Sequence, residues 1–68
     1  MNGFIDKIEQ LRKDHGYTNL QVARALGSEN EAFYRRKTSG KVRFNYDDIK
    51  ALIALYHLNS EEIADLFS

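Results

Sequence analysis

Apolar residues recur through this chain at the three- and four-residue spacing that gives an α-helix one buried face. The first such run is Phe4, Ile5, Ile8 and Leu11, and comparable runs follow it as far as residue 67. Proline is absent, so no pyrrolidine ring interrupts a helix. The spacing therefore predicts an all-α fold, and a chain of 68 residues is expected to form one domain over residues 1–68.

The first two helices are predicted from the residues that flank them. Asn2 is a candidate N-cap of the first helix, and Gly16 suits the left-handed conformation that commonly ends a helix. A second helix is expected to begin at Thr18 or Asn19. Gly27 would end it in the same way as Gly16 ends the first.

Three more helices are predicted from capping patterns. Ser28-x-x-Glu31 reads as a capping box, in which the Ser hydroxyl and the Glu carboxylate each accept from the other residue's amide. The third helix would follow at once and run to about Lys37. Asn45-x-x-Asp48 and Asn59-x-x-Glu62 are expected to start the fourth and the fifth. The fold prediction is therefore a five-helix domain.

The core is predicted from the inward faces of these helices. Its expected members are Phe4, Ile8, Leu11, Val22, Leu26, Phe33, Ile49 and Leu52. With Phe33 turned inward, Tyr34 lies about 100° further around the helix and is expected to be exposed.

Charge is distributed unevenly although the chain carries no net charge. Residues 1–27 carry +1, residues 28–43 carry +3 and residues 44–68 carry −4. Local potential, rather than total charge, attracts a polyanion to a surface. The middle of the chain is therefore a candidate surface for nucleic acid.

Several classes of function are excluded by what the sequence lacks. There is no cysteine, and neither His15 nor His57 has partners at metal-ligand spacing, so no metal or cofactor is expected. Asp47-Asp48 and Glu61-Glu62 lie in the first turns of helices, where capping and the helix dipole explain them better than catalysis. No arrangement of nucleophile and base is present, so the chain is not expected to be an enzyme.

The chain is also not expected to enter a membrane. No stretch approaches the roughly 20 apolar residues that span a bilayer, and the charged start does not read as a secretory signal. We therefore expect a cytoplasmic protein, and one too small to hold a separate domain for a small-molecule effector.

The short connection Leu26-Gly27-Ser28 is long enough only for a sharp turn between the second and third helices, as in a helix-turn-helix. With one helix before this pair and two after it, the chain resembles the lambda-repressor-like family, which includes phage repressors and Cro proteins. Short phage-encoded members are the most similar in their segments FYRR and EEIADLF. The resemblance rests on an ordered set of motifs: Ile8-x-x-Leu11-Arg12, Gly16-Tyr17-Thr18, Val22-Ala23-x-x-Leu26-Gly27, Phe33, Ile49-x-x-Leu52 and Asn59-x-x-Glu62-Ile63.

The resemblance implies a sequence-specific transcriptional regulator that binds double-stranded DNA, with its third helix in the major groove. The positions that face base edges in such proteins correspond here to Glu29, Asn30, Glu31, Tyr34 and Arg35. Phosphate contacts are implied at the start of the second helix and in the basic cluster that ends the third helix and continues into the next loop. These residues are Asn19, Arg36, Lys37, Lys41 and Arg43.

Two features of the sequence leave alternatives open. Glu29 and Glu31 stand where the family commonly has Ser, Gln, Arg or Lys, which favours an antirepressor-like module that binds a protein instead of DNA. The apolar stripe of the predicted fifth helix suggests a weak homodimer, or else it folds back on the core. That stripe consists of Ile63, Leu66 and Phe67.

Overall fold

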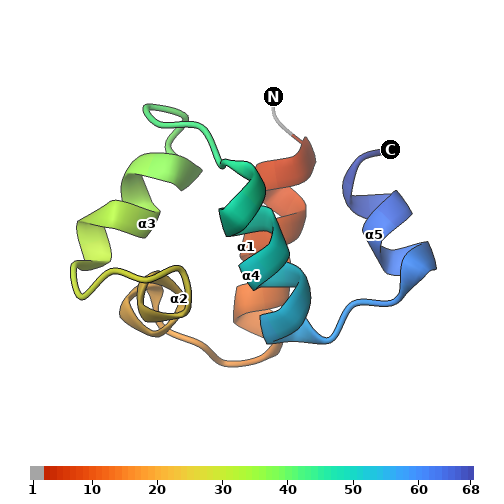
Figure 1. Ribbon diagram of the computed structural model, residues 1–68, viewed down its shortest axis with the longest axis horizontal. Helices are drawn as coiled ribbons and strands as arrows, with labels where there is room; N and C mark the ends of the chain where they lie inside the picture. The colour runs from red at the N-terminus through yellow and green to blue at the C-terminus, as the bar shows by residue number, and fades with distance from the viewer. Residues whose placement is uncertain (1–2) are drawn as a thin grey trace.

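The structure is a computed structural model that describes residues 3–68, and these residues form five α-helices (Figure 1). The helices are α1 Gly3–Asp14, α2 Asn19–Ala25, α3 Glu31–Thr38, α4 Tyr46–Tyr56 and α5 Ser60–Leu66. No strand is present in residues 3–68, so the all-α prediction is confirmed. Asn2, the candidate N-cap of α1, lies outside the described residues.

Reciprocal capping boxes begin three of the helices, because each satisfies two backbone groups that the first turn leaves free. At α4, the Asn45 side chain accepts from the amide of Asp48 at 2.8 Å, and the Asp48 carboxylate accepts from the amide of Asn45 at 3.0 Å. Asn59 and Glu62 make the same exchange at α5. Both starts were predicted. Thr18 is the N-cap of α2, in a box with Gln21.

Left-handed residues end each of the first four helices, and Gly27 ends α2 with φ of +97° as predicted. Gly16 has φ of +70° and brings the Tyr17 amide within 3.0 Å of the Arg12 carbonyl, as the sequence predicts. His57 takes the corresponding position after α4 with φ of +51°, although it is not glycine. The Leu58 amide then donates to the Ile53 carbonyl at 3.1 Å, so the chain turns sharply toward α5.

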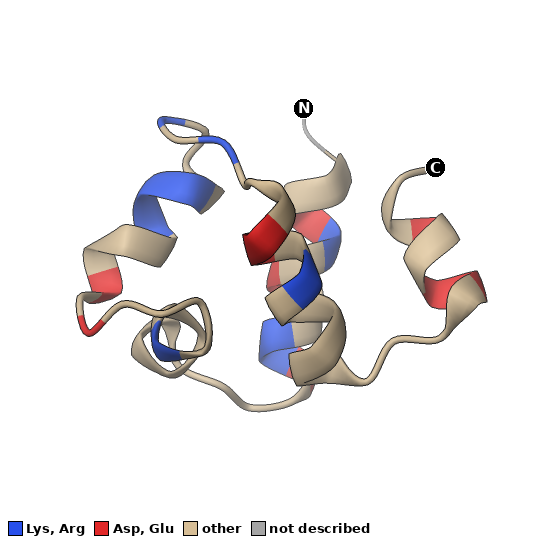
Figure 2. Cartoon of the chain, in the orientation of Figure 1, with Lys and Arg blue, Asp and Glu red and all other residues tan. Residues whose placement is uncertain are grey.

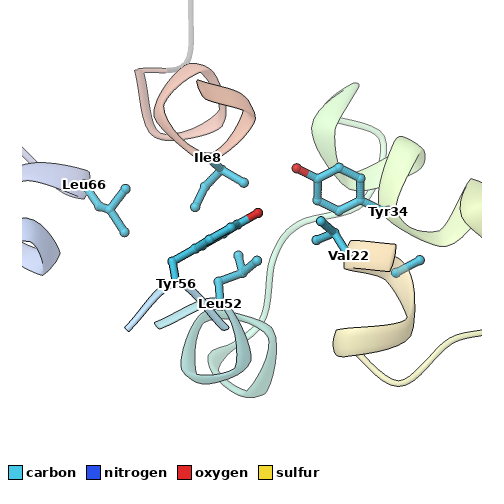
Figure 3. Close-up of a cluster of buried hydrophobic side chains, with 7 residues drawn as sticks. Ile8, Val22, Tyr34, Leu52, Tyr56 and Leu66 are labelled. Carbon is cyan, nitrogen blue, oxygen red and sulfur yellow. The ribbon is translucent and has the colours of Figure 1, made fainter. Parts of the chain in front are cut away.

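All five helices contribute to one core. In Figure 1, α1 and α4 lie in the middle, with α2 and α3 on one side and α5 on the other. Side chains from each helix converge between them (Figure 3). The buried apolar residues are Ile8, Val22, Ala23, Tyr34, Leu52, Tyr56 and Leu66. Burying these side chains is the main favourable term for a domain this small.

Three of the eight predicted core residues are fully buried, namely Ile8, Val22 and Leu52. The other five, Phe4, Leu11, Leu26, Phe33 and Ile49, are half-buried at the edges of the core. Phe44 lies beside Phe4 with ring centroids 5.5 Å apart, so it anchors the loop after α3 to α1.

The apolar stripe of α5 faces its own domain. Leu66 is 4% exposed and belongs to the core, and Ile63 is half-buried. Phe67 is 57% exposed but stacks on Phe4 with ring centroids 5.3 Å apart. The expectation that Leu66 contributes to a dimer interface is therefore wrong, because α5 uses that side chain to pack on α1 and α4.

Candidate nucleic-acid interface

The connection between α2 and α3 is longer than the sequence predicts. Five residues, 26–30, separate the two helices, whereas the pattern predicted three. Asn30 is the N-cap of α3, and its side-chain oxygen accepts from the Ala32 amide at 2.9 Å. The Ser28 hydroxyl accepts from the Asn30 amide at 3.1 Å instead of capping the helix. The predicted box between Ser28 and Glu31 is therefore wrong, because Asn30 caps the helix two residues later.

Both glutamates at this end of α3 lie beside arginines. Glu29 is in the turn, and its carboxylate is 3.0 Å from the Arg24 guanidinium of α2. Glu31 is in the first turn of α3 and lies 3.6 Å from Arg35, one turn later. All four side chains are largely solvent-exposed, so each pair adds little stability. The pairs nevertheless place a positive charge next to each negative one at the exposed end of α3.

Tyr34 is buried, which corrects the prediction that it is exposed and contacts bases. Its side chain points into the core from α3 (Figure 3) and is fully buried. The hydroxyl donates to the Glu9 carboxylate of α1 at 3.1 Å, and the Arg12 side chain donates to the same carboxylate at 2.7 Å. Burial and the neighbouring Glu9 charge raise the pKa of Tyr34, so the phenol remains a neutral donor.

This hydrogen bond predicts a measurable loss of stability when the Tyr34 hydroxyl is removed. Tyr34→Phe should lower the free energy of unfolding by about 1 kcal/mol, since it removes a donor from Glu9 while Arg12 remains. Tyr46→Phe is a matched control because Tyr46 is 74% exposed, and it should change stability by less than about 0.5 kcal/mol. Urea titration followed by circular dichroism measures both changes. Equal effects in the two variants would contradict the role of the Tyr34 hydroxyl.

Lys37 is also buried, so the prediction that it contacts phosphate is wrong. It is 4% exposed, and its ammonium group forms an ion pair with the buried Asp48 carboxylate at the start of α4. The same ammonium lies 4.6 Å from the centre of the Phe33 ring and 3.5 Å from the Arg43 carbonyl. Lys37 therefore joins α3, the following loop and α4, and has no free face toward solvent.

Four predicted cations do remain exposed: Arg35, Arg36, Lys41 and Arg43. The loop after α3 folds back on the end of the helix, because the amides of Lys41 and Val42 both donate to the Arg36 carbonyl, at 3.0 and 3.2 Å. Figure 2 shows the resulting gathering of basic residues over the second half of α3 and this loop.

Three of these cations surround one shallow hollow of about 290 Å³. Arg35 and Arg36 line it from α3, Lys41 lines it from the loop, and Ala32 and Ser39 complete it. The side chains of Arg36, Lys41 and Arg43 have no hydrogen-bond or ion-pair partner among residues 3–68. Unpaired cations around a concave surface are suited to bind an anion such as a phosphate group.

Asn19 does not line this hollow. It is the first residue of α2 and is half-buried. Its side-chain oxygen is buried without a hydrogen-bond partner in the described part of the chain. A phosphate can accept only from a donor, so the Asn19 amide nitrogen is the atom of this side chain that suits the predicted contact.

Sequence reasoning missed Arg24, which pairs with Glu29 although the two are five positions apart. No helical spacing rule joins these positions, because one lies on α2 and the other in the turn. Only the path of the turn brings them together.

Comparisons with protein-family models, with curated proteins and with solved structures find no match to this chain. In residues 3–68 no group of three His, Cys, Asp or Glu side chains is arranged to hold a metal ion. None of the helices described is both long and apolar enough to cross a membrane.

Proposed function

We propose that this protein is a sequence-specific DNA-binding transcriptional regulator of the lambda-repressor-like type, acting in the cytoplasm of a phage-infected or lysogenic cell. The observation that carries the proposal is the set of four exposed cations on α3 and its loop, three of them without a partner in residues 3–68. α3 enters the major groove, and Arg36, Lys41 and Arg43 contact phosphates on the rim of the groove.

Base readout falls to the exposed side chains at the start and in the middle of α3. Arg35 matches the acceptors of guanine, and Glu31 can accept from a cytosine amino group. Asn30 uses its oxygen to cap α3, so only its side-chain nitrogen is free to donate to a base. Tyr34 and Lys37 have no part in contact with DNA, since both side chains are buried.

Titration of the native chain with a random-sequence duplex at several salt concentrations tests the proposal. Three or four phosphate contacts predict a slope of log K against log salt of about −3 to −4. Selection of bound fragments from a random pool then reports the preferred sequence and any palindromy. A chain that fails to bind any duplex at low salt would overturn the proposal.

A substitution at Glu29 tests more specifically whether this end of α3 faces DNA. Glu29→Gln should tighten binding to a random duplex by about twofold to fivefold at low salt, because it removes a repulsive charge and frees Arg24 from its ion pair. Asp6→Asn is the matched control, since it removes one negative charge from the first turn of α1. If the two variants bind alike, Glu29 does not face DNA.

One observation favours a second function, that of a module that binds a protein. The side chain of Glu29 is 81% exposed, and Glu31 lies nearby at the exposed end of α3, where DNA-binding helices seldom benefit from negative charge. A basic protein partner would fit this end of the helix. The titration with random duplex separates the two functions, because such a module would not show the steep salt dependence.

A further inference from the structure

A groove of about 360 Å³ lies between α1 and α5, on the other side of the molecule from α3. Its floor is apolar and is formed by Leu11, Leu58 and Leu66. Carboxylates surround this floor, from α1 at Asp14 and from the length of α5 at Glu61, Glu62 and Asp65. The groove therefore suits an occupant with an apolar side chain flanked by positive charges.

The negative charges of the carboxylates around this groove are only partly balanced by positive charges of the same chain. Glu61 has no ion-pair or hydrogen-bond partner in residues 3–68. Among residues 3–68, Lys7 is the one cation that lines the groove, and its ammonium lies 3.7 Å from the Asp65 carboxylate and is bonded to the Asp65 carbonyl and to the Ser68 hydroxyl. The groove consequently keeps a negative potential toward an incoming group.

The loop after α3 has the complementary pattern. Val42 is one of the few large apolar side chains that remain exposed, at 43%. Lys41 and Arg43 flank it, and neither side chain has a partner among the described residues. The backbone bonds to Arg36 hold this loop in one conformation, so little chain entropy would be lost when it binds.

We propose that the groove between α1 and α5 binds the Lys41-Val42-Arg43 loop of a second copy of this chain. Val42 enters over the leucine floor, while Lys41 and Arg43 pair with the surrounding carboxylates, chiefly Glu61. α3 and α5 lie at opposite ends of the long axis (Figure 1), so a molecule cannot fill its own groove. The contact is therefore head-to-tail, and repetition of such a contact produces open chains, or rings where the rotation between copies closes.

The association is weak, because one loop in one groove covers less surface than a stable interface needs. It is also sensitive to salt, since paired surface charges are screened. If Lys41 and Arg43 contact phosphates, as the proposed function holds, then self-association and DNA binding use the same loop and exclude each other.

Sedimentation equilibrium of the native chain tests the self-association without DNA. From about 10 µM to about 1 mM protein in low salt, the average molar mass should rise past that of a dimer. Raising the salt to about 0.5 M should return it toward the monomer. A strict monomer at the highest concentration in low salt, or a plateau at a closed dimer, would overturn the proposal.

Charge reversal on each side of the contact identifies the surfaces. Glu61→Lys and Lys41→Glu should each remain monomeric alone, because each places like charges across the contact. An equimolar mixture of the two should associate again. In the mixture, the altered groove of one variant meets the altered loop of the other, and the unaltered groove meets the unaltered loop, so both contacts join opposite charges. Asp6→Lys, with the same charge change in the first turn of α1, should associate like the native chain. Failure of the mixture to associate would contradict the proposal.

Two further experiments, with a peptide and with DNA, test the self-association separately from the proposed function. A monomeric chain whose groove binds a basic amphipathic peptide would assign the groove to another protein and overturn the inference. Random duplex DNA should disperse the self-associated chains if the loop serves both partners. Self-association that persists in a chain unable to bind DNA would overturn the proposed function and leave this inference standing.

Discussion

Lys37→Met is expected to lower the free energy of unfolding by about 3–5 kcal/mol, because it leaves the buried Asp48 carboxylate without its counter-charge. Asp48 would keep only its bond from the Asn45 amide, which cannot compensate a full charge away from water. A loss of this size approaches the whole stability of a small domain. Urea denaturation followed by circular dichroism should show a largely unfolded variant at 25 °C.

A second substitution separates the ion pair from simple packing. Lys37→Met combined with Asp48→Asn should recover most of the loss, since asparagine keeps an acceptor for the Asn45 amide without the buried charge. Lys50→Met on the exposed face of α4 should cost less than about 0.5 kcal/mol. If the double variant is no more stable than Lys37→Met, the pair does not account for the effect.

Replacing Arg36, Lys41 and Arg43 together by alanine should weaken binding to a random duplex by about two to three orders of magnitude at 0.1 M salt. Each phosphate contact contributes about one unit to the salt slope, so the slope should fall by about three. All three side chains lack partners in residues 3–68, and the fold should therefore tolerate their removal. Fluorescence anisotropy at several salt concentrations measures both quantities.

Single substitutions measure how much each cation contributes to DNA binding. Lys41→Ala and Arg43→Ala should each lower the slope by about one and weaken all DNA sequences alike. Lys13→Ala combined with Lys50→Ala removes two exposed cations outside α3 and its loop, and should lower the slope by less than one of these single variants. An unchanged slope in the triple variant would remove these residues from the phosphate contacts.

The positions of the helices could be predicted because the signals that set them are local. Asn45 and Asn59 each bond to an amide three residues ahead, and Gly16 turns the chain within two residues. Such contacts need no knowledge of the rest of the molecule. The exception is the start of α3, where Ser28 and Asn30 are both good N-caps. The structure uses Asn30, and Ser28 supports it from the turn.

The exposed cations of the candidate site were also predictable, because arginine and lysine side chains stay in water unless a partner is buried with them. Arg35, Arg36, Lys41 and Arg43 follow this rule. Lys37 does not, because its counter-charge lies eleven positions further along the chain. No spacing rule within one helix could identify that partner.

The buried face of α3 was not specified by local sequence signals. It depends on the assembled domain. Apolar spacing indicates one inward face, and on α3 it pointed to Phe33. The packed molecule instead buries Tyr34 and Lys37 more deeply, since Glu9 of α1 and Asp48 of α4 satisfy their polar ends. Those partners are 25 and 11 positions away, so only the packing of three helices brings them together. A polar side chain can be buried when such a partner is present, and this arrangement determines which face of α3 meets solvent.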